Sequence, residues 1–109
     1  MTKVIYNEKQ LTLELIGHCG HHEPGIGDIV CAAVSFLSQT LLKNLILYRD
    51  MGWYQLEWDM DTPGEMYIHA KTNGHFSFVI EMFRFVMVGF RMLAEKYPEN
   101  VKVIETGGD

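Results

Sequence analysis

Residues 11–37, LTLELIGHCGHHEPGIGDIVCAAVSFL, contain the change of pattern that decides the fold. Leu11, Leu13 and Leu15 alternate with polar residues, and this period of two is typical of a strand with one buried face. From residue 29 to residue 48 the chain has no Gly or Pro, and its apolar residues recur at helical spacings. A strand and a helix therefore flank a polar loop rich in Gly, His and Cys.

The rest of the chain adds four strands and one helix. The polar residues NEKQ before Leu11 predict a hairpin between the first two strands. We expect the remaining strands at residues 2–6, 54–58, 66–70 and 101–105, and a helix at about 77–97 that ends before Pro98. The order ββαββαβ predicts a two-layer α+β domain, with two helices on one face of a mostly antiparallel sheet.

The second predicted helix is apolar almost all round. Its polar residues form only a thin stripe through Glu81, Arg84, Arg91 and Glu95. A helix in a two-layer monomer leaves one face to water and does not need this composition. The helix is therefore either central in the fold or part of a subunit interface.

Length and composition limit the class of protein. The chain has 109 residues, 48% of them hydrophobic, which fits a single globular domain over residues 1–109. Its net charge of −5 and the lack of a Lys/Arg cluster argue against direct nucleic-acid binding and favour a basic protein or peptide partner. No signal peptide is evident, and charges interrupt the apolar run at residues 76–93. We therefore expect a cytoplasmic protein, with no membrane partner and with its two cysteines as thiols.

Cys31 is the candidate nucleophile. If Asp28 is the N-cap of the first helix, Cys31 is the third helical residue. The positive end of the helix would lower the pKa of its thiol there, and the free backbone N–H groups would form an oxyanion hole. The alternative is that Cys31 is simply one of the small buried residues of this helix.

His18 follows the strand directly and is the candidate general base. In that position it could take the proton of Cys31, although it could also be an ordinary surface histidine. Asp28 caps the helix and could in addition orient His18. Ser35 lies one turn after Cys31 on the same helix face, where it hydrogen-bonds either near the active site or to its own helix backbone.

The remaining His and Cys residues of the loop raise the question of a zinc site. His18, Cys19, His21 and His22 are the right ligand types. Adjacent histidines rarely bind one ion together, however, and the sequence has no second cluster of ligands. We expect no metal and no cofactor.

The glycines of the loop suggest another role. Gly20, Gly25 and Gly27 leave the segment from Cys19 to Gly27 without a strong local preference. We expect it to be a mobile loop that closes over a bound peptide.

These residues resemble the ribosomal-processing cysteine protease (Prp) family. The similarity is carried by Gly17-His18 at a strand end, by the Gly-rich loop and by DIVCAAVS from Asp28 to Ser35. It runs along nearly the whole chain, because the ending LAEKYPENVKVIE at residues 93–105 is similar too.

The resemblance implies a bacterial α+β homodimer. Members remove an N-terminal extension from large-subunit ribosomal protein twenty-seven by cutting after an aromatic residue, which supports ribosome assembly. The family's nucleophile falls on Cys31 and its base on His18. Its motif Gly, Asp and Ser fall on Gly17, Asp28 and Ser35, and its flexible loop falls on residues 19–27.

The sequence departs from the family pattern in two places. The loop is about one residue longer, which bears on peptide specificity. Cys19 stands where the family usually has Ala. A second thiol beside the base leads to the hypothesis that Cys19 and Cys31 form a reversible inhibitory disulfide.

We therefore interpret the chain as a cysteine endopeptidase with a Cys31–His18 dyad. Two alternatives remain open at this point. The same fold could process a phage or prophage structural protein, because the Met- and aromatic-rich second half differs from the chromosomal type. It could also bind peptide without cutting it, as an assembly factor.

Overall fold

The computed structural model describes residues 1–17, 25–62 and 64–108, apart from the side chains of residues 26–28. The elements, in chain order, are β1 (Thr2–Asn7), β2 (Thr12–Ile16), α1 (Ile26–Arg49), β3 (Tyr54–Asp59), β4 (Met66–Thr72), α2 (Phe76–Lys96) and β5 (Val101–Thr106). The predicted order ββαββαβ is confirmed.

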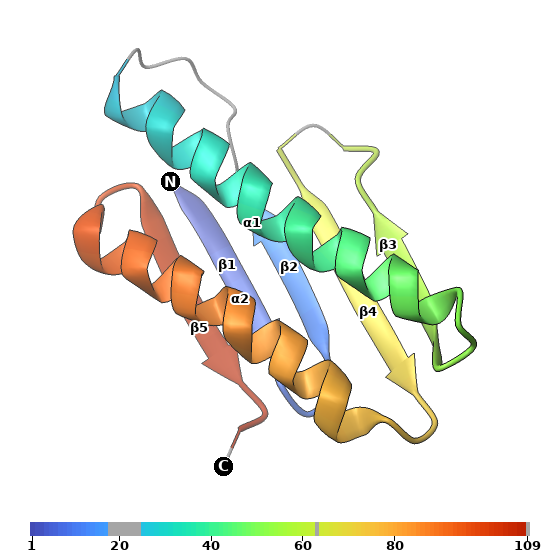
Figure 1. Cartoon of the computed structure of the whole chain (residues 1–109). Coiled ribbons are helices and arrows are strands. Elements are labelled where there is room, and N and C mark those ends of the chain that lie inside the picture. Colours follow the sequence, from blue (N-terminus) through green and yellow to red (C-terminus); the bar gives the residue numbers. More distant parts are fainter. Residues whose placement is uncertain (18–24, 63, 109) are drawn as a thin grey trace.

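The described strands form one five-stranded sheet in the order β3-β4-β2-β1-β5. All neighbours are antiparallel except β1 and β5, which are parallel. Figure 1 shows both helices on the same face of this sheet, which leaves the other face without a helical cover. The two-layer α+β architecture is confirmed.

The core lies between the sheet and the two helices. The alternation predicted around residue 13 holds, because Leu13 and Leu15 are buried on the helix-facing side of β2. Opposite them, α1 buries Val34 and Leu45, and α2 buries Phe83 among others. Burial of these side chains stabilises the fold by about 1.5–3 kcal/mol each.

The strands are tied to the helices by polar contacts as well. The Tyr54 hydroxyl at the start of β3 donates a hydrogen bond of 2.5 Å to the Leu45 carbonyl oxygen of α1.

Residues 29–49 of α1 form a helix that is long and apolar enough to cross a membrane, judged by length and composition alone. In the structure they are the core helix of the domain, with Val30, Val34 and Leu45 buried in the cluster of core side chains.

Candidate active site

The site begins where β2 ends, at Gly17. Its φ of 75° lies in the left-handed region that favours glycine. A Cβ at this position would stand 2.7 Å from the backbone oxygen of Met1, closer than such atoms approach. Only glycine therefore lets the chain turn here, directly before the candidate base His18.

The helix that carries Cys31, the candidate nucleophile, starts earlier than the sequence predicted. Gly25, with φ 103° and no side-chain cap bond, is the N-cap of α1. The Ile29 amide already donates to the Gly25 carbonyl oxygen at 3.2 Å, so residues 26–28 form the first turn. The prediction that Asp28 is the N-cap is wrong, because the helix has begun by that residue.

This start moves Cys31 away from the helix end. Cys31 is the sixth residue of α1, counting from Ile26, whereas only the first four N–H groups of a helix lack partners within it. The dipole effect also fades after the first turn. The prediction that the Cys31 amide is among the free N–H groups of an oxyanion hole is therefore wrong.

Cys31 and Ser35 lie one turn apart on α1, and both side chains are partly buried. Cys31 is disulfide-bonded in this structure. A disulfide sulfur carries no thiol proton and cannot attack a carbonyl. The structure therefore shows Cys31 in an oxidised form, contrary to the thiol that the sequence analysis expected, and a role as nucleophile would require its reduction.

Several of the proposed site residues fall outside the described part of the chain. These are His18, Cys19, Gly20, His21 and His22, which all lie in the segment 18–24. Gly25 and the backbone of Gly27 belong to the start of α1, so the prediction that the loop extends to Gly27 is wrong at its C-terminal end. Where the chain is described, no three His, Cys, Asp or Glu side chains are grouped to hold a metal ion.

An acidic hollow of about 180 Å³ adjoins the end of β2, and the sequence analysis did not identify it. Its lining includes Glu14, Asp59 and Glu65. The strand register aligns Glu14 with Tyr67, and Tyr67 with Asp59, so these three side chains form one row on the helix-free face. The alternation of β2 had placed Glu14 on that face, but strand pairing was needed to bring Asp59 beside it.

The comparisons with known proteins agree with this arrangement. The sequence model of the family described as Cysteine protease Prp matches residues 1–102. A comparison with curated proteins returned no relative.

Solved structures share the fold over almost the whole chain. SMU.848 from Streptococcus mutans is 32% identical, with a TM-score of 0.70 over 96% of this chain and 91% of that one. The ribosomal processing protease Prp from S. aureus, solved with a substrate peptide, is 18% identical, with a TM-score of 0.73 over 96% and 97% of the two chains. The same protease with a covalently linked product peptide is 22% identical, with a TM-score of 0.72 over the same shares.

The family match covers far more than half of the chain and includes the helix with Cys31. The strand order, the helix pair on one face and the length of the match agree with each other. The chain therefore belongs to the Cysteine protease Prp family, and it is a cysteine protease.

Proposed function

We propose that Cys31 and His18 form the catalytic dyad of this protease. His18 takes the proton of the reduced Cys31 thiol, the sulfur attacks the peptide carbonyl carbon, and His18 returns the proton to the leaving amine. Water then hydrolyses the thioester and restores the thiol. The observation that carries the proposal is the family match across residues 1–102, with Cys31 on the helix face that Ser35 shares.

The supporting residues receive proposed roles. Gly17 allows the turn that precedes His18. Ser35 forms a hydrogen bond beside Cys31. Asp28, which does not cap α1, orients His18. The segment from Cys19 to Pro24 closes over an extended peptide and positions its scissile bond beside Cys31.

We propose that the substrate is the N-terminal extension of large-subunit ribosomal protein twenty-seven. The S. aureus relative is described as a ribosomal processing protease. The net charge of −5 and the acidic hollow at the end of β2 suit a basic ribosomal protein by electrostatic steering. The protein would then act in the bacterial cytoplasm, during ribosome assembly.

The test is a cleavage assay read by mass spectrometry under reducing conditions. The substrate is the host's own protein twenty-seven with its extension intact. We expect one cut by the wild type, none by Cys31→Ala, and an unchanged cut by Lys43→Ala, a control on the exposed side of α1. A cut that survives in Cys31→Ala would exclude the proposed nucleophile.

Failure to cut this substrate leads to the alternatives. The pH dependence of Cys31 alkylation separates them, because an active dyad makes the thiol reactive near neutral pH and His18→Ala slows that reaction. A reactive thiol would indicate another substrate, such as a phage structural protein. An unreactive thiol would favour a peptide-binding assembly factor.

We also propose that the protein is a homodimer. The outer helical face, defined by Phe36 of α1 and Phe85, Val88 and Met92 of α2, is apolar and uncovered. The exposed fractions of these side chains are 78%, 83%, 50% and 65%. Isolated exposed apolar residues are common, but four on adjacent helices form a patch of the kind that marks an interface.

Two hollows follow the seam between the helices on this face. One, of about 410 Å³, is lined by Phe36, Leu37 and Met92 among others, and one of about 350 Å³ includes Phe78 and Phe85. Polar side chains such as Lys96 and Glu81 stand at their rims. An apolar centre with a polar rim is the usual anatomy of a protein interface, and it explains why α2 is apolar almost all round.

A further inference from the structure

The pair Asn73-Gly74 occurs once in the chain, in the connection between β4 and α2. The side-chain amide carbon of an asparagine can be attacked by the backbone nitrogen of the residue that follows it. A glycine in the following position leaves this approach open, because it has no Cβ. The pair therefore sets an electrophilic carbon beside the least hindered backbone nitrogen that a protein offers.

The fold leaves both residues accessible. Asn73 and Gly74 are exposed, and they lie after the last residue of β4 and before the N-cap of α2. Gly74 has a φ of 89°, and apart from its chain neighbours no described atom lies within 4 Å of its Cβ position. The Gly74 amide and the Asn73 side chain make no hydrogen bond to any residue that the structure describes. The two reacting groups are therefore free to meet.

Three further asparagines provide a comparison within the same molecule. They are Asn7, Asn44 and Asn100. The amide after the first, Glu8, donates to the Thr106 carbonyl oxygen at 2.9 Å, and the amide after the last, Val101, donates to the Tyr97 carbonyl oxygen at 3.1 Å. The amide of Leu45 belongs to the hydrogen-bonded interior of α1. At each of these positions a hydrogen bond must break before the nitrogen can attack.

We propose that Asn73-Gly74 is a self-modification site, at which the asparagine is converted to aspartate and isoaspartate. The Gly74 nitrogen attacks Cγ of Asn73, the new C–N bond closes a five-membered imide ring, and the side-chain amide leaves as ammonia. Water then opens the ring. Attack at Cγ gives aspartate, and attack at the main-chain carbonyl carbon gives isoaspartate, whose main chain runs through Cβ and Cγ. One water is consumed, one ammonia is released, and no oxidant is needed.

Both products place a new negative charge just before α2. The first turn of this helix has no acidic residue, and its N-cap, His75, makes no side-chain cap bond. The positive end of the helix is therefore not compensated by its own residues. Because a carboxylate near a helix N-terminus is stabilising, the aspartate form should be at least as stable as the parent.

Isoaspartate acts differently, because it adds a methylene group to the main chain directly before His75. The His75 ring stacks on Trp53 with centroids 4.3 Å apart and an angle of 14° between the rings. Trp53 also packs against Phe78 of α2 at 5.2 Å and against Tyr48 of α1 at 5.1 Å between centroids. These rings join the end of α1 to the start of α2. A longer main chain displaces His75, so the isoaspartate form should lose the stack on Trp53.

The modification site is remote from the proposed catalytic residues. Figure 1 shows the β4–α2 connection near the end of the molecule where α1 ends. Cys31 is the sixth residue of α1, which has 24 residues, and so lies close to the other end of that helix. The reaction at Asn73 should therefore occur equally in Cys31→Ala, whether or not the proposed dyad is correct.

The test is peptide mapping by mass spectrometry while the full chain is incubated in mildly alkaline buffer at physiological temperature. The exchange of NH₂ for OH changes the peptide mass, and an isoaspartyl methyltransferase labels the isoaspartate product. We expect Asn73 to react roughly tenfold faster than the other three asparagines, whose next amides are held. It should also react as fast as the free peptide KTNGHF, which is residues 71–76. Denaturant should accelerate the other three and leave Asn73 unchanged.

Variants and separated products complete the test. Asn73→Gln should abolish the reaction, because the longer side chain would have to close a six-membered ring, and Asn44→Gln should leave the reaction at Asn73 unchanged. The isoaspartate form should melt roughly 4–8 °C below the parent, as expected for one lost ring stack, whereas Asn73→Asp should not melt lower. A reaction at Asn73 tenfold slower in the folded chain than in the peptide, or a faster reaction at another asparagine, would overturn the site. Equal melting of the isoaspartate form and the parent would overturn its link to the His75 stack.

Discussion

The turn at Gly17 shows how much of the site depends on one missing Cβ. Gly17→Ala would force an alanine into φ 75° and place its Cβ 2.7 Å from the Met1 oxygen. Gly52, at φ 84° and with nothing within 4 Å of its Cβ position, is a matched control for the backbone strain alone. We expect Gly52→Ala to cost roughly 1–2 kcal/mol and Gly17→Ala to cost more.

Thermal unfolding and kcat/KM measure the two parts of this prediction. Each kcal/mol lowers Tm by about 4–8 °C in a domain of this size. Gly17→Ala should also lower kcat/KM, because His18 is the next residue, while Gly52→Ala should not. Equal effects of the two substitutions on Tm and on activity would contradict the role given to the Met1 contact.

The oxidised state of Cys31 leads to a redox prediction. Cys31 is disulfide-bonded in the structure, and the only other cysteine in the sequence is Cys19, which lies outside the described residues. We expect peroxide to inactivate the enzyme and a thiol reductant to restore it, since reduction transfers two electrons to the disulfide and regenerates the Cys31 thiol.

Peptide mapping without reduction checks this directly. Oxidised wild type should yield a peptide that links residues 19 and 31, and Cys19→Ala should yield none. Reductant should restore the wild type fully, whereas oxidised Cys19→Ala should progress to acids that a thiol does not reduce. Two unlinked, oxidised cysteines in the wild type would refute the switch.

At the scale of single residues the sequence predicted the class of enzyme, but it misplaced one candidate residue in the helix. The place of Cys31 in α1 was predicted wrongly because Asp28 is a good capping residue and the sequence Gly25-Ile26-Gly27 is typical of a loop. The structure begins the helix at Ile26 with a glycine cap. Helix propensity favours a start at Asp28, but tertiary packing can override this local preference.

At the scale of elements, Tyr54 joins β3 to α1 through its bond to the Leu45 carbonyl oxygen. Burial is the main cause that raises the pKa of Tyr54 from 10.0 to about 12, and Tyr48 adds to it. The folded state therefore disfavours the phenolate of Tyr54. The protonated Tyr54 contributes fully to the free energy of unfolding below pH 10, and this contribution is lost as the pH rises from about 10 to about 12.

Tyr54→Phe tests this link. At pH 7 the loss of the hydrogen bond should cost about 1 kcal/mol. Between pH 10 and pH 12 the variant should lose less stability than the wild type, because it has no phenol to ionise in the unfolded state. Denaturant unfolding at pH 7 and at several alkaline pH values measures both effects. If the unfolding free energy of the variant and of the wild type fell equally between pH 10 and pH 12, the assignment to Tyr54 would be contradicted.

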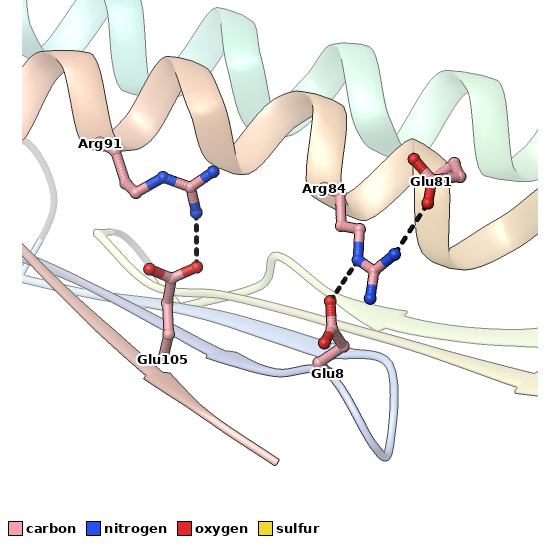
Figure 2. A network of polar contacts seen from close by, with 5 residues as sticks. All are labelled: Glu8, Glu81, Arg84, Arg91 and Glu105. Atoms are coloured by element: carbon pink, nitrogen blue, oxygen red, sulfur yellow. Dashed lines mark hydrogen bonds and ion pairs between the residues drawn. The ribbon is translucent and has the colours of Figure 1, made fainter. Parts of the chain in front are cut away.

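The elements themselves were predictable because each has one clear period. The alternation at residues 11–15 and the helical spacing after residue 29 identified β2 and α1, and the turn chemistry near Pro98 ended α2. The strand order was not predictable, since β5 pairs with β1 across nearly the whole chain. The ion pair between Glu8 and Arg84 was not predictable for the same reason, because it joins the residue after β1 to a helix far along the chain (Figure 2).

At the scale of the whole molecule the exposed outer helical face is the feature that the single chain does not explain. A standard interface buries about 800 Å² of each partner, which is about an eighth of this chain's surface of 6788 Å². The four side chains of the face and the two hollows beside them can supply much of that area. The acidic hollow at the end of β2 is lined by side chains of the opposite, helix-free face of the sheet. A dimer through the outer helical face would therefore leave this hollow open to a peptide.

Phe85→Glu tests the dimer, because Phe85 is 83% exposed and its replacement leaves the core of the chain intact. Sedimentation should give twice the chain mass of 12.6 kDa for the wild type and the single mass for the variant. Met51→Glu, at an exposed apolar side chain outside the outer helical face, should remain dimeric. Unchanged melting of Phe85→Glu, extrapolated to low protein concentration, would show that the fold is retained. A wild type that stays monomeric at micromolar concentration, or a dimeric Phe85→Glu, would assign the face to another partner.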